Sequence, residues 1–256
     1  MSQVAQCRRP KRTKFWFGLA AACAAAVFVA FPELNIRLSA DHLTAVGEKA
    51  RVELPDGSIA WLNTNTAIDV QYQPEQRQIV LLQGEARFEV ARERDRPFQV
   101  LADSGQSRAL GTVFSVSEVG ESVVVSVIEG RVEVTSSTGS GDLWHDNTAK
   151  KAVLGLDQQV SYFPDGELSS VREFDSSKSD SWRNGYLSIR NLAFERAVEE
   201  IERYHPARIL LLADKNNLGP VTARLSIKDI DSGLDAIAAT QGLTVTKIGG
   251  FLIVLR

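Results

Sequence analysis

Three short stretches in the first half of the chain share one arrangement of apolar residues around a glycine. Apolar side chains stand five and three positions before Gly57, Gly84 and Gly130, and two and four positions after each of them. If each glycine is the second residue of a two-residue loop, these positions face one another across a β-hairpin. Glycine fits such loops because they require a positive φ angle. The spacing predicts three hairpins whose apolar faces stack into a common core.

Further short strands are predicted between and after these three stretches. Apolar and polar residues alternate at 67–72, 98–100, 110–116 and 153–163, with turn residues between them. We therefore expect an all-β domain at residues 44–172, built from stacked hairpins as a twisted two-sheet structure of the solenoid or jelly-roll kind.

The pattern changes after a polar, serine-rich stretch at 173–181, which we interpret as a linker. Residues 182–256 then show a strand, a helix with an apolar stripe from Phe194 to Ile201, two strands, and a second helix that stops at Gly242. Asn191 is the expected cap of the first helix. Residues 243–248 and 251–255 are expected to pair across Gly249-Gly250. The order predicts a small α+β domain with two helices on one mixed sheet.

The amino-terminal segment combines a basic cluster with an apolar run. Residues 1–14 carry five basic and no acidic side chains, and residues 15–31 carry no charge. A helix over those 17 residues is about 26 Å long, enough for a thin bilayer. The flanking positive charge favours a cytoplasmic amino terminus and an exported remainder, hence a single-pass membrane protein. A cleaved signal peptide and a buried core helix are the alternatives that we keep open.

Composition restricts the chemistry of the exported part. Outside residues 1–14 the chain holds 24 basic and 32 acidic side chains, a balance that argues against nucleic-acid binding. Both cysteines lie at or before the apolar run, and His42, His145 and His205 stand far apart in sequence. No nucleophile elbow, phosphate-binding loop or zinc-protease motif occurs. We expect no catalytic residue, no metal site and no cofactor.

Charged residues cluster between positions 85 and 97. Glu85, Glu89 and Glu93 alternate with arginines, which is more typical of a solvated strand face than of an acid–base pair. The stretch at 92–97 (RERDRP) suggests either an anion-binding strip or a salt-bridged loop, and its mixed signs favour the loop.

Several of these features together resemble the exported domain of FecR-type transmembrane regulators. The resemblance spans roughly residues 44–135 and is carried by these elements: Gly47-Glu48, Leu54-x-Asp56-Gly57-Ser58, Leu62-Asn63, Gly84-Glu85-Ala86-x-Phe88-x-Val90, Arg96-Pro97-Phe98-x-Val100, Leu110-Gly111-Thr112-x-Phe114-x-Val116 and Glu129-Gly130-x-Val132. Residues 182–256 look like the small domain shared by secretins and TonB-dependent receptors. That second resemblance is looser.

The resemblance implies a periplasmic signal receiver in iron–siderophore uptake. Such a protein is contacted by the signalling domain of an outer-membrane TonB-dependent transducer and regulates an extracytoplasmic-function sigma factor. Only 14 residues precede the apolar run, too few for the sigma-binding module of this family, so direct binding of the sigma factor is not expected here. An envelope scaffold without sigma-factor control is the alternative.

The last strand is the predicted docking site for a partner. An exposed strand edge accepts a partner strand through main-chain hydrogen bonds. We assign this role to Phe251, Leu252, Ile253, Val254 and Leu255, with a core strand as the competing interpretation.

Overall fold

A computed structural model describes residues 34–137, 149–176 and 180–256. The described residues between Ala40 and Arg256 form one compact unit. The apolar segment at 15–31 lies outside the described residues. Within the described parts, no helix is both long enough and apolar enough to span a bilayer.

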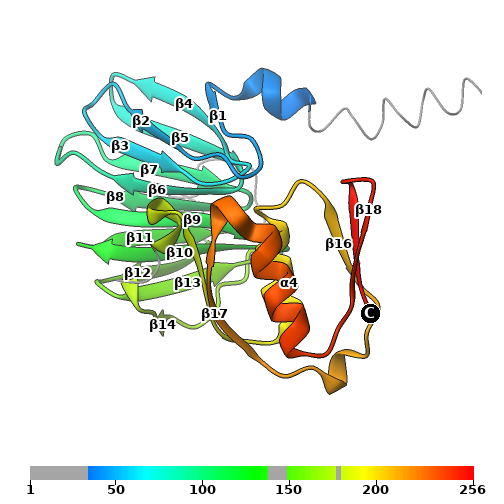
Figure 1. The fold of residues 1–256 in the computed structure, drawn as a ribbon. Coiled ribbons are helices and arrows are strands. Elements are labelled where there is room, and N and C mark those ends of the chain that lie inside the picture. Colours follow the sequence, from blue (N-terminus) through cyan, green and yellow to red (C-terminus); the bar gives the residue numbers. More distant parts are fainter. Residues whose placement is uncertain (1–33, 138–148, 177–179) are drawn as a thin grey trace, which may run out of the picture. The chain divides into compact units, whose positions relative to one another are not determined.

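Two seven-stranded sheets form the first part of this unit (Figure 1). One runs in the order β1 (His42–Leu43), β4 (Ala67–Gln73), β5 (Gln76–Gln83), β7 (Phe98–Ala102), β8 (Gly105–Ala109), β11 (Val132–Ser136) and β12 (Lys150–Leu154). The other runs in the order β14 (Arg172–Glu173), β13 (Gln158–Tyr162), β10 (Ser122–Glu129), β9 (Val113–Val119), β6 (Glu85–Glu89), β3 (Ile59–Leu62) and β2 (Ala50–Glu53). All neighbours are antiparallel except β5 and β7. The predicted two-sheet, mainly β architecture is confirmed.

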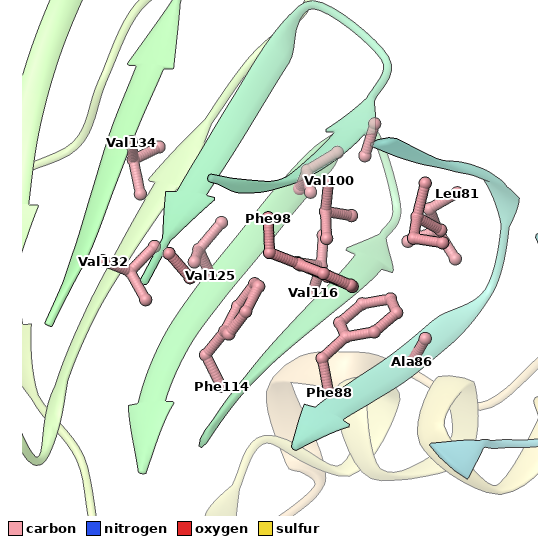
Figure 2. Packing of buried hydrophobic residues seen from close by; sticks show 14 of the residues in the cluster. Leu81, Ala86, Phe88, Phe98, Val100, Phe114, Val116, Val125, Val132 and Val134 are labelled. Atoms are coloured by element: carbon pink, nitrogen blue, oxygen red, sulfur yellow. The ribbon is translucent and has the colours of Figure 1, made fainter. Parts of the chain in front are cut away.

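The core between the sheets is aliphatic with an aromatic centre (Figure 2). Phe88 of one sheet lies 5.5 Å, centroid to centroid, from Phe98 of the other and 5.5 Å from Phe114. All three rings are fully buried. Tilted aromatic pairs at this separation add about 0.5–1.5 kcal/mol each beyond their burial, so this cluster fastens one sheet to the other.

Only the first of the three predicted hairpins forms. Around Gly57, β2 and β3 pair antiparallel, but Val52 lies opposite Ala60 and the Leu54 amide bonds the Ser58 carbonyl at 2.8 Å. The loop therefore has three residues, 55–57, and the predicted two-residue turn is wrong by one position. Because side chains alternate along a strand, this shift turns Ala60 and Leu62 to the core and Trp61 away from it.

Gly84 and Gly130 are not hairpin turns, and that prediction is wrong. At each of these glycines the chain leaves one sheet and enters the other: β5 and β6, like β10 and β11, belong to different sheets. The flanking residues Leu81 and Ala86, and likewise Val127 and Val132, are buried in one core from opposite sheets. A crossover between stacked sheets therefore produces the same apolar spacing as a hairpin.

Arg77 is a fully buried cation at one end of the sandwich. Its Nη1 donates to Asp56 Oδ2 at 2.6 Å and to the Ala91 carbonyl at 3.0 Å, and its Nε donates to the Arg96 carbonyl at 2.9 Å. The guanidinium carbon lies 5.7 Å from the centroid of Phe98. Burial alone would raise the pKa of Asp56, but hydrogen bonds from Ser58, Arg77 and Tyr72 outweigh it and hold the pKa below its usual value.

The second hydrophobic cluster belongs to the α+β part of the unit. Its elements are η1 (Ser181–Asn184), β15 (Tyr186–Leu192), α3 (Phe194–Glu202), β16 (Arg208–Leu211), η2 (Lys215–Asn217), β17 (Val221–Ser226), η3 (Ile227–Asp229), α4 (Ile230–Thr240), β18 (Val245–Ile248) and β19 (Leu252–Leu255). The order of strands and helices is as predicted. We call residues 180–256 the carboxy-terminal module.

The single mixed sheet expected for this module is in fact two sheets. β15 pairs with β17, while β16, β19 and β18 form a three-stranded sheet. Figure 1 shows α4 between β17 on one side and β16 and β18 on the other. Asn191 does not cap α3, because it lies at a register shift in β15 with a φ of 47°, and the helix begins at Phe194 after Ala193. Gly242, with a φ of 71°, follows the end of α4 as expected.

We predict that Gly84→Ala destabilises the chain more than Gly57→Ala. A Cβ at Gly84 would lie 2.6 Å from the Asn65 carbonyl oxygen and 2.7 Å from the Thr66 Cα, whereas a Cβ at Gly57 meets nothing within 4 Å. Both glycines have positive φ, so each alanine costs about 1–2 kcal/mol for conformation alone. The backbone collision at Gly84 adds about 2 kcal/mol more. Urea unfolding of both purified variants measures the difference, and equal losses would contradict this account.

We predict that Asp56→Asn removes about 3 kcal/mol of stability at pH 7, because it leaves the buried Arg77 cation with only Glu93, at 3.7 Å, as a counter-charge. The folded-state pKa of Asp56 is lowered, so its contribution is complete above the usual Asp pKa of about 3.9 and is lost as the pH falls through the folded value. The gap between variant and wild type in urea midpoint should therefore narrow from pH 7 to pH 3. Asp95→Asn, at an exposed position, is the control and should leave the urea midpoint unchanged at both pH 7 and pH 3.

Candidate functional site

The outward face of β6 is the surface on which the carboxy-terminal module lies. Ala86 and Phe88 point into the sandwich, so Glu85, Arg87 and Glu89 point away from it. Each of these three side chains makes an ion pair with the module. The expectation of a solvated face is therefore wrong. Arg87 is buried, and the charged side chains of β6 form ion pairs with the carboxy-terminal module.

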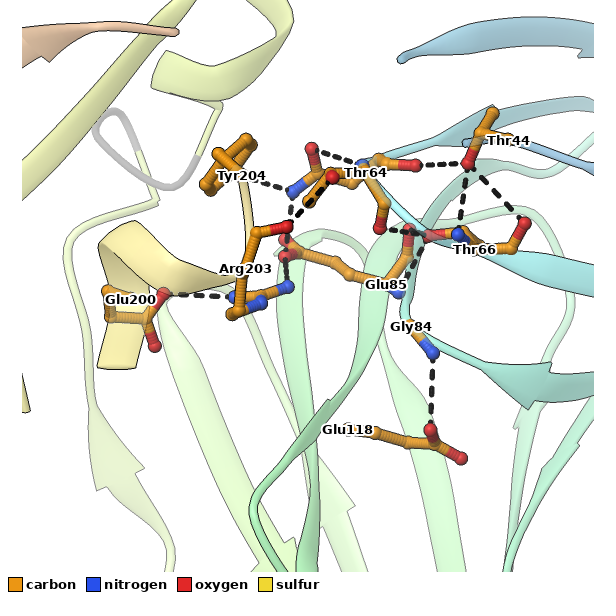
Figure 3. Close-up of polar contacts among 10 residues, drawn as sticks. Thr44, Thr64, Thr66, Gly84, Glu85, Glu118, Glu200, Arg203 and Tyr204 are labelled. Atoms are coloured by element: carbon orange, nitrogen blue, oxygen red, sulfur yellow. Dashed lines mark hydrogen bonds and ion pairs between the residues drawn. The ribbon is translucent and has the colours of Figure 1, made fainter. Parts of the chain in front are cut away.

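The first half of this interface is built around Arg203 at the end of α3 (Figure 3). Its Nη2 lies 2.7 Å from Glu85 Oε2, and its Nη1 lies 3.0 Å from Glu200 Oε2. Burial alone would lower the pKa of Arg203, but the two carboxylates outweigh it and raise the pKa. Arg203 is thus a permanent cation held between one acid of the sandwich and one of its own helix.

Neutral hydrogen bonds surround this ion pair. Asn63 donates through Nδ2 to the Tyr204 hydroxyl at 2.7 Å and to Glu85 at 3.0 Å. Thr64 donates to the Arg203 carbonyl at 2.9 Å and accepts from the Gly47 amide at 2.8 Å. Burial raises the pKa of Tyr204, so its hydroxyl stays protonated. Asn63 and Thr64 directly follow β3, and both side chains are buried.

The second half of the interface is centred on Arg87 and Trp61. Arg87 pairs with Asp180, and Arg183 lies 3.4 Å from Glu89. Burial raises the pKa of Asp180, and the charge of Arg87 opposes this rise. Trp61 donates its Nε1 to Glu89 at 3.1 Å, and the guanidinium of Arg183 lies 4.3 Å from the centroid of the indole ring. Trp61 packs against the module's cluster, which is the consequence of the shifted register in the first hairpin.

A groove of about 670 Å³ runs along this interface. Gly84 and Glu118 line it from the sandwich, and Glu200, Arg203 and Arg208 line it from the module. Glu118 accepts the Gly84 amide at 3.1 Å (Figure 3), and burial raises the pKa of its carboxyl. Four acids, Glu118, Glu199, Glu200 and Glu202, face two arginines in its lining, so the groove is acidic overall.

The histidines and acids of the described residues do not assemble a metal site. No group of three or more His, Cys, Asp or Glu in ligand geometry occurs in the ranges that the structure covers. His205 Nε2 lies 3.3 Å from Asp231 and its Nδ1 accepts the Ala207 amide at 2.9 Å, so it orders the turn before β16. His145 lies outside the described residues.

The predicted docking strand is not an edge strand. β19 pairs with β16 on one side and with β18 on the other, so its main chain has no free edge. The prediction that Phe251–Leu255 accept a partner strand through main-chain hydrogen bonds is therefore wrong. Ile253 and Leu255 are buried in the module's core. Phe251 precedes the strand and is 66% exposed. The free edges of this sheet belong to β16 and β18.

One face of the three-stranded sheet is open and apolar. Ile209 and Ile253 share the face that packs against the module's core, so Leu210, Val254 and Ile248 lie on the opposite face. Four large apolar side chains are exposed on this face or at its ends: Leu210, Leu212, Ile248 and Phe251. Exposed apolar surfaces of this kind are typical of protein-interaction sites.

Sequence reasoning missed both Arg77 and the pairing of β6 with the module. For Arg77 there was no local signal. For β6, a signal existed in the strict alternation of Glu85, Arg87 and Glu89 with buried residues, because a strand with regular charges on one face and a core on the other suits a polar interface equally well.

Comparison with known proteins agrees with this picture. Residues 40–133 match the FecR family, described as FecR protein. Two crystal structures of a putative anti-sigma factor from Parabacteroides distasonis superpose with TM-scores of 0.67 and 0.66. Each shares 26% sequence identity with this chain, over 84% of this chain and 97% of that protein. No curated protein matches the sequence significantly.

The two-sheet fold and the family match of residues 40–133 together define a β domain of the FecR class in the first part of the unit. Residues 40–133 therefore form a FecR domain, and the resemblance stated from the motifs is confirmed for these residues. The looser resemblance of residues 182–256 to the small domain of secretins and TonB-dependent receptors stays a prediction.

We predict a coupling of about 2 kcal/mol between Glu85 and Arg203, because both groups are partly buried and their charged atoms lie 2.7 Å apart. Urea unfolding of Glu85→Gln, Arg203→Met and the double variant measures it, with Trp61 and Trp182 as fluorophores at the interface. The matched control is Glu202–Arg208, where Arg208 is 87% exposed and the coupling should stay below about 0.5 kcal/mol. A coupling at Glu85–Arg203 no larger than the control would show that this ion pair does not hold the module.

Proposed function

We propose that this protein regulates a sigma factor by receiving a protein signal at its carboxy-terminal module and passing it to the FecR domain. The FecR match and the likeness to an anti-sigma factor support regulation in general, and both point away from an enzyme. The single observation that carries the proposal is the ion-paired face of β6, which joins the module to the FecR domain through charges.

The module offers a partner both a strand edge and an apolar face. The amides of Arg208 and Leu212 donate toward β19, so the alternate residues Ile209 and Leu211 direct their main-chain groups away from it. β16 has no strand on that side within the described part of the chain. A partner strand added there would also cover Leu210 and Leu212.

The path from this edge to the FecR domain is short. Tyr204 lies four residues before Arg208, the first residue of β16, and both Arg203 and Tyr204 contact the sandwich directly. A partner that moves β16 therefore acts on the same turn that carries the Glu85 ion pair. This arrangement gives docking at the module a mechanical connection to β6.

We further propose that the partner is the signalling domain of an outer-membrane TonB-dependent transducer and that the pathway serves iron–siderophore uptake. In this proposal residues 15–31 anchor the chain in the bacterial inner membrane and the rest lies in the periplasm. The basic cluster before the apolar run and the absence of thiols after it support this location. The sigma factor is then controlled at the cytoplasmic side, directly or through another chain.

We predict that Leu210→Asp with Leu212→Asp weakens binding of the cognate transducer domain at least tenfold, because two carboxylates would be buried at the added strand. The full chain is immobilised and tested by pull-down and titration against purified signalling domains of the host's transducers. Val171→Asp, at another exposed apolar position, is the control and should bind like the wild type. Failure of every domain to bind folded wild-type chain, or equal binding by the double variant, would reject this docking site.

A transcriptional reporter separates signalling from a scaffold role. Deletion of the gene should change transcription from the promoter of the cognate sigma factor, and Glu85→Gln with Arg203→Met should blunt the inducer response while partner binding persists. Unchanged transcription in the deletion strain would favour an envelope scaffold.

A further inference from the structure

A second groove lies on the FecR domain, formed by residues of three neighbouring strands of one sheet and the loop after β6. Its volume is about 1070 Å³, and β8, β11 and β12 and their connections supply most of its wall. Its lining contains four arginines, Arg92, Arg94, Arg108 and Arg131, against one acid, Glu133. The chain after residue 14 carries more acids than bases, so this groove is a local reversal of charge.

The charged residues of the 92–97 loop face in two directions, with Arg92 and Arg94 lining the groove and Glu93 facing Arg96 and Arg77. Glu93 turns toward the sandwich, where its carboxylate lies 2.6 Å from Arg96 and 3.7 Å from the buried Arg77. Asp95, the other acid of this loop, is exposed and does not line the groove. Arg92 and Arg94 are left exposed on the groove side, and neither has an ion pair within the described residues.

Two glycines and a threonine form the floor of the groove. A Cβ at Gly111 would lie 2.9 Å from Arg92 Cγ, so this glycine lets the arginine stem lie flat across the backbone. A Cβ at Gly130 would lie 2.8 Å from Thr112 Cγ2. The Thr112 hydroxyl is buried and has no hydrogen-bond partner among the residues described. The floor is thus closely packed, and the Thr112 hydroxyl is shielded from solvent.

Apolar side chains complete the wall. Leu110, Val153 and Leu156 line the groove, and about half or more of each side chain is exposed. A small inorganic anion would contact the arginines but not the three exposed apolar groups. A peptide with acidic and apolar side chains would pair with the arginines and also cover these apolar residues.

The groove also adjoins an unpaired strand. β12 is the last strand of its sheet, and it pairs only with β11 within the described ranges. An extended segment placed beside β12 would find main-chain partners there, with alternate side chains directed at the groove and at solvent.

We infer that this groove binds an acidic, apolar-containing extended segment of a partner protein, at a site separate from the module's docking face. The arginines pair with the acidic side chains of the segment, and Leu110, Val153 and Leu156 contact its apolar side chains. The site is independent of the proposed docking at β16, because none of its lining residues belongs to the module.

The test uses the full chain and a synthetic peptide that alternates Asp or Glu with Leu and Val. We expect micromolar binding by fluorescence anisotropy, at least tenfold weaker binding of the matched peptide with Asn and Gln in place of the acids, and weakening with added salt. Replacing Arg92, Arg94 and Arg131 together by Ala should weaken the acidic peptide at least tenfold.

Two controls keep the outcome specific. Replacing the exposed arginines Arg172, Arg190 and Arg196 by Ala removes the same charge elsewhere and should leave binding unchanged. Leu110→Ser with Leu156→Ser should weaken the peptide severalfold, which general attraction between opposite charges would not produce.

Several results would overturn the inference. These are no preference for the acidic peptide over its amide counterpart, equal loss in both arginine triples, or binding of inorganic phosphate with no binding of the peptide. Sedimentation that shows a dimer abolished by the Arg92, Arg94 and Arg131 triple, without peptide binding, would assign the groove to a second copy of this chain. The Leu210 and Leu212 variant should bind the peptide normally, so failure here and failure of the proposed function are separate results.

Discussion

The buried pair between Arg77 and Asp56 is the constraint on which the FecR domain depends. Arg77 stands on β5 of one sheet, while Asp56 belongs to the loop between β2 and β3 of the other. The same guanidinium also binds the carbonyls of Ala91 and Arg96, in the connection that carries the chain from β6 to β7. One cation therefore joins three chain segments that are distant in sequence. A buried ion pair adds little net stability over an apolar replacement, so its main effect here is to fix one arrangement of these segments.

That arrangement explains where sequence reasoning succeeded and where it failed. The alternation of apolar residues predicted the strands, the all-β class and the inward-facing residues, because burial on one face of a strand leaves a period of two in any sheet. It could not tell which sheet each strand joins. Leu81 and Ala86 meet the same core whether Gly84 turns a hairpin or carries the chain across the sandwich, and only the pairing partners, which lie elsewhere in sequence, decide between the two.

The candidate site was predictable to a smaller extent, for a related reason. A strand with Glu85, Arg87 and Glu89 on one face looks solvated when the opposing charges, Arg203, Asp180 and Arg183, lie about 90 to 120 residues away. The docking strand failed differently. The apolar run at 251–255 correctly indicated a strand, but apolar side chains do not reveal which edges of a strand are paired, and β19 has a neighbour at each edge.

The charged character of the β6 interface suits a contact that has to change. Apolar surfaces that separate must be hydrated at a cost proportional to their area, and they invite wrong partners while exposed. Ions that separate regain hydration, so an interface of paired charges opens with a smaller net cost. In this chain apolar groups, above all Trp61, lie beside the ion pairs and determine how closely the module packs against β6. Glu85, Arg87 and Glu89 determine which face of the module packs there. Under the proposed function, a signal that alters the turn at Arg203 and Tyr204 would act on the charged part of the interface, which costs the least free energy to rearrange. The sandwich behind β6 is held separately, by Arg77 and the phenylalanine cluster.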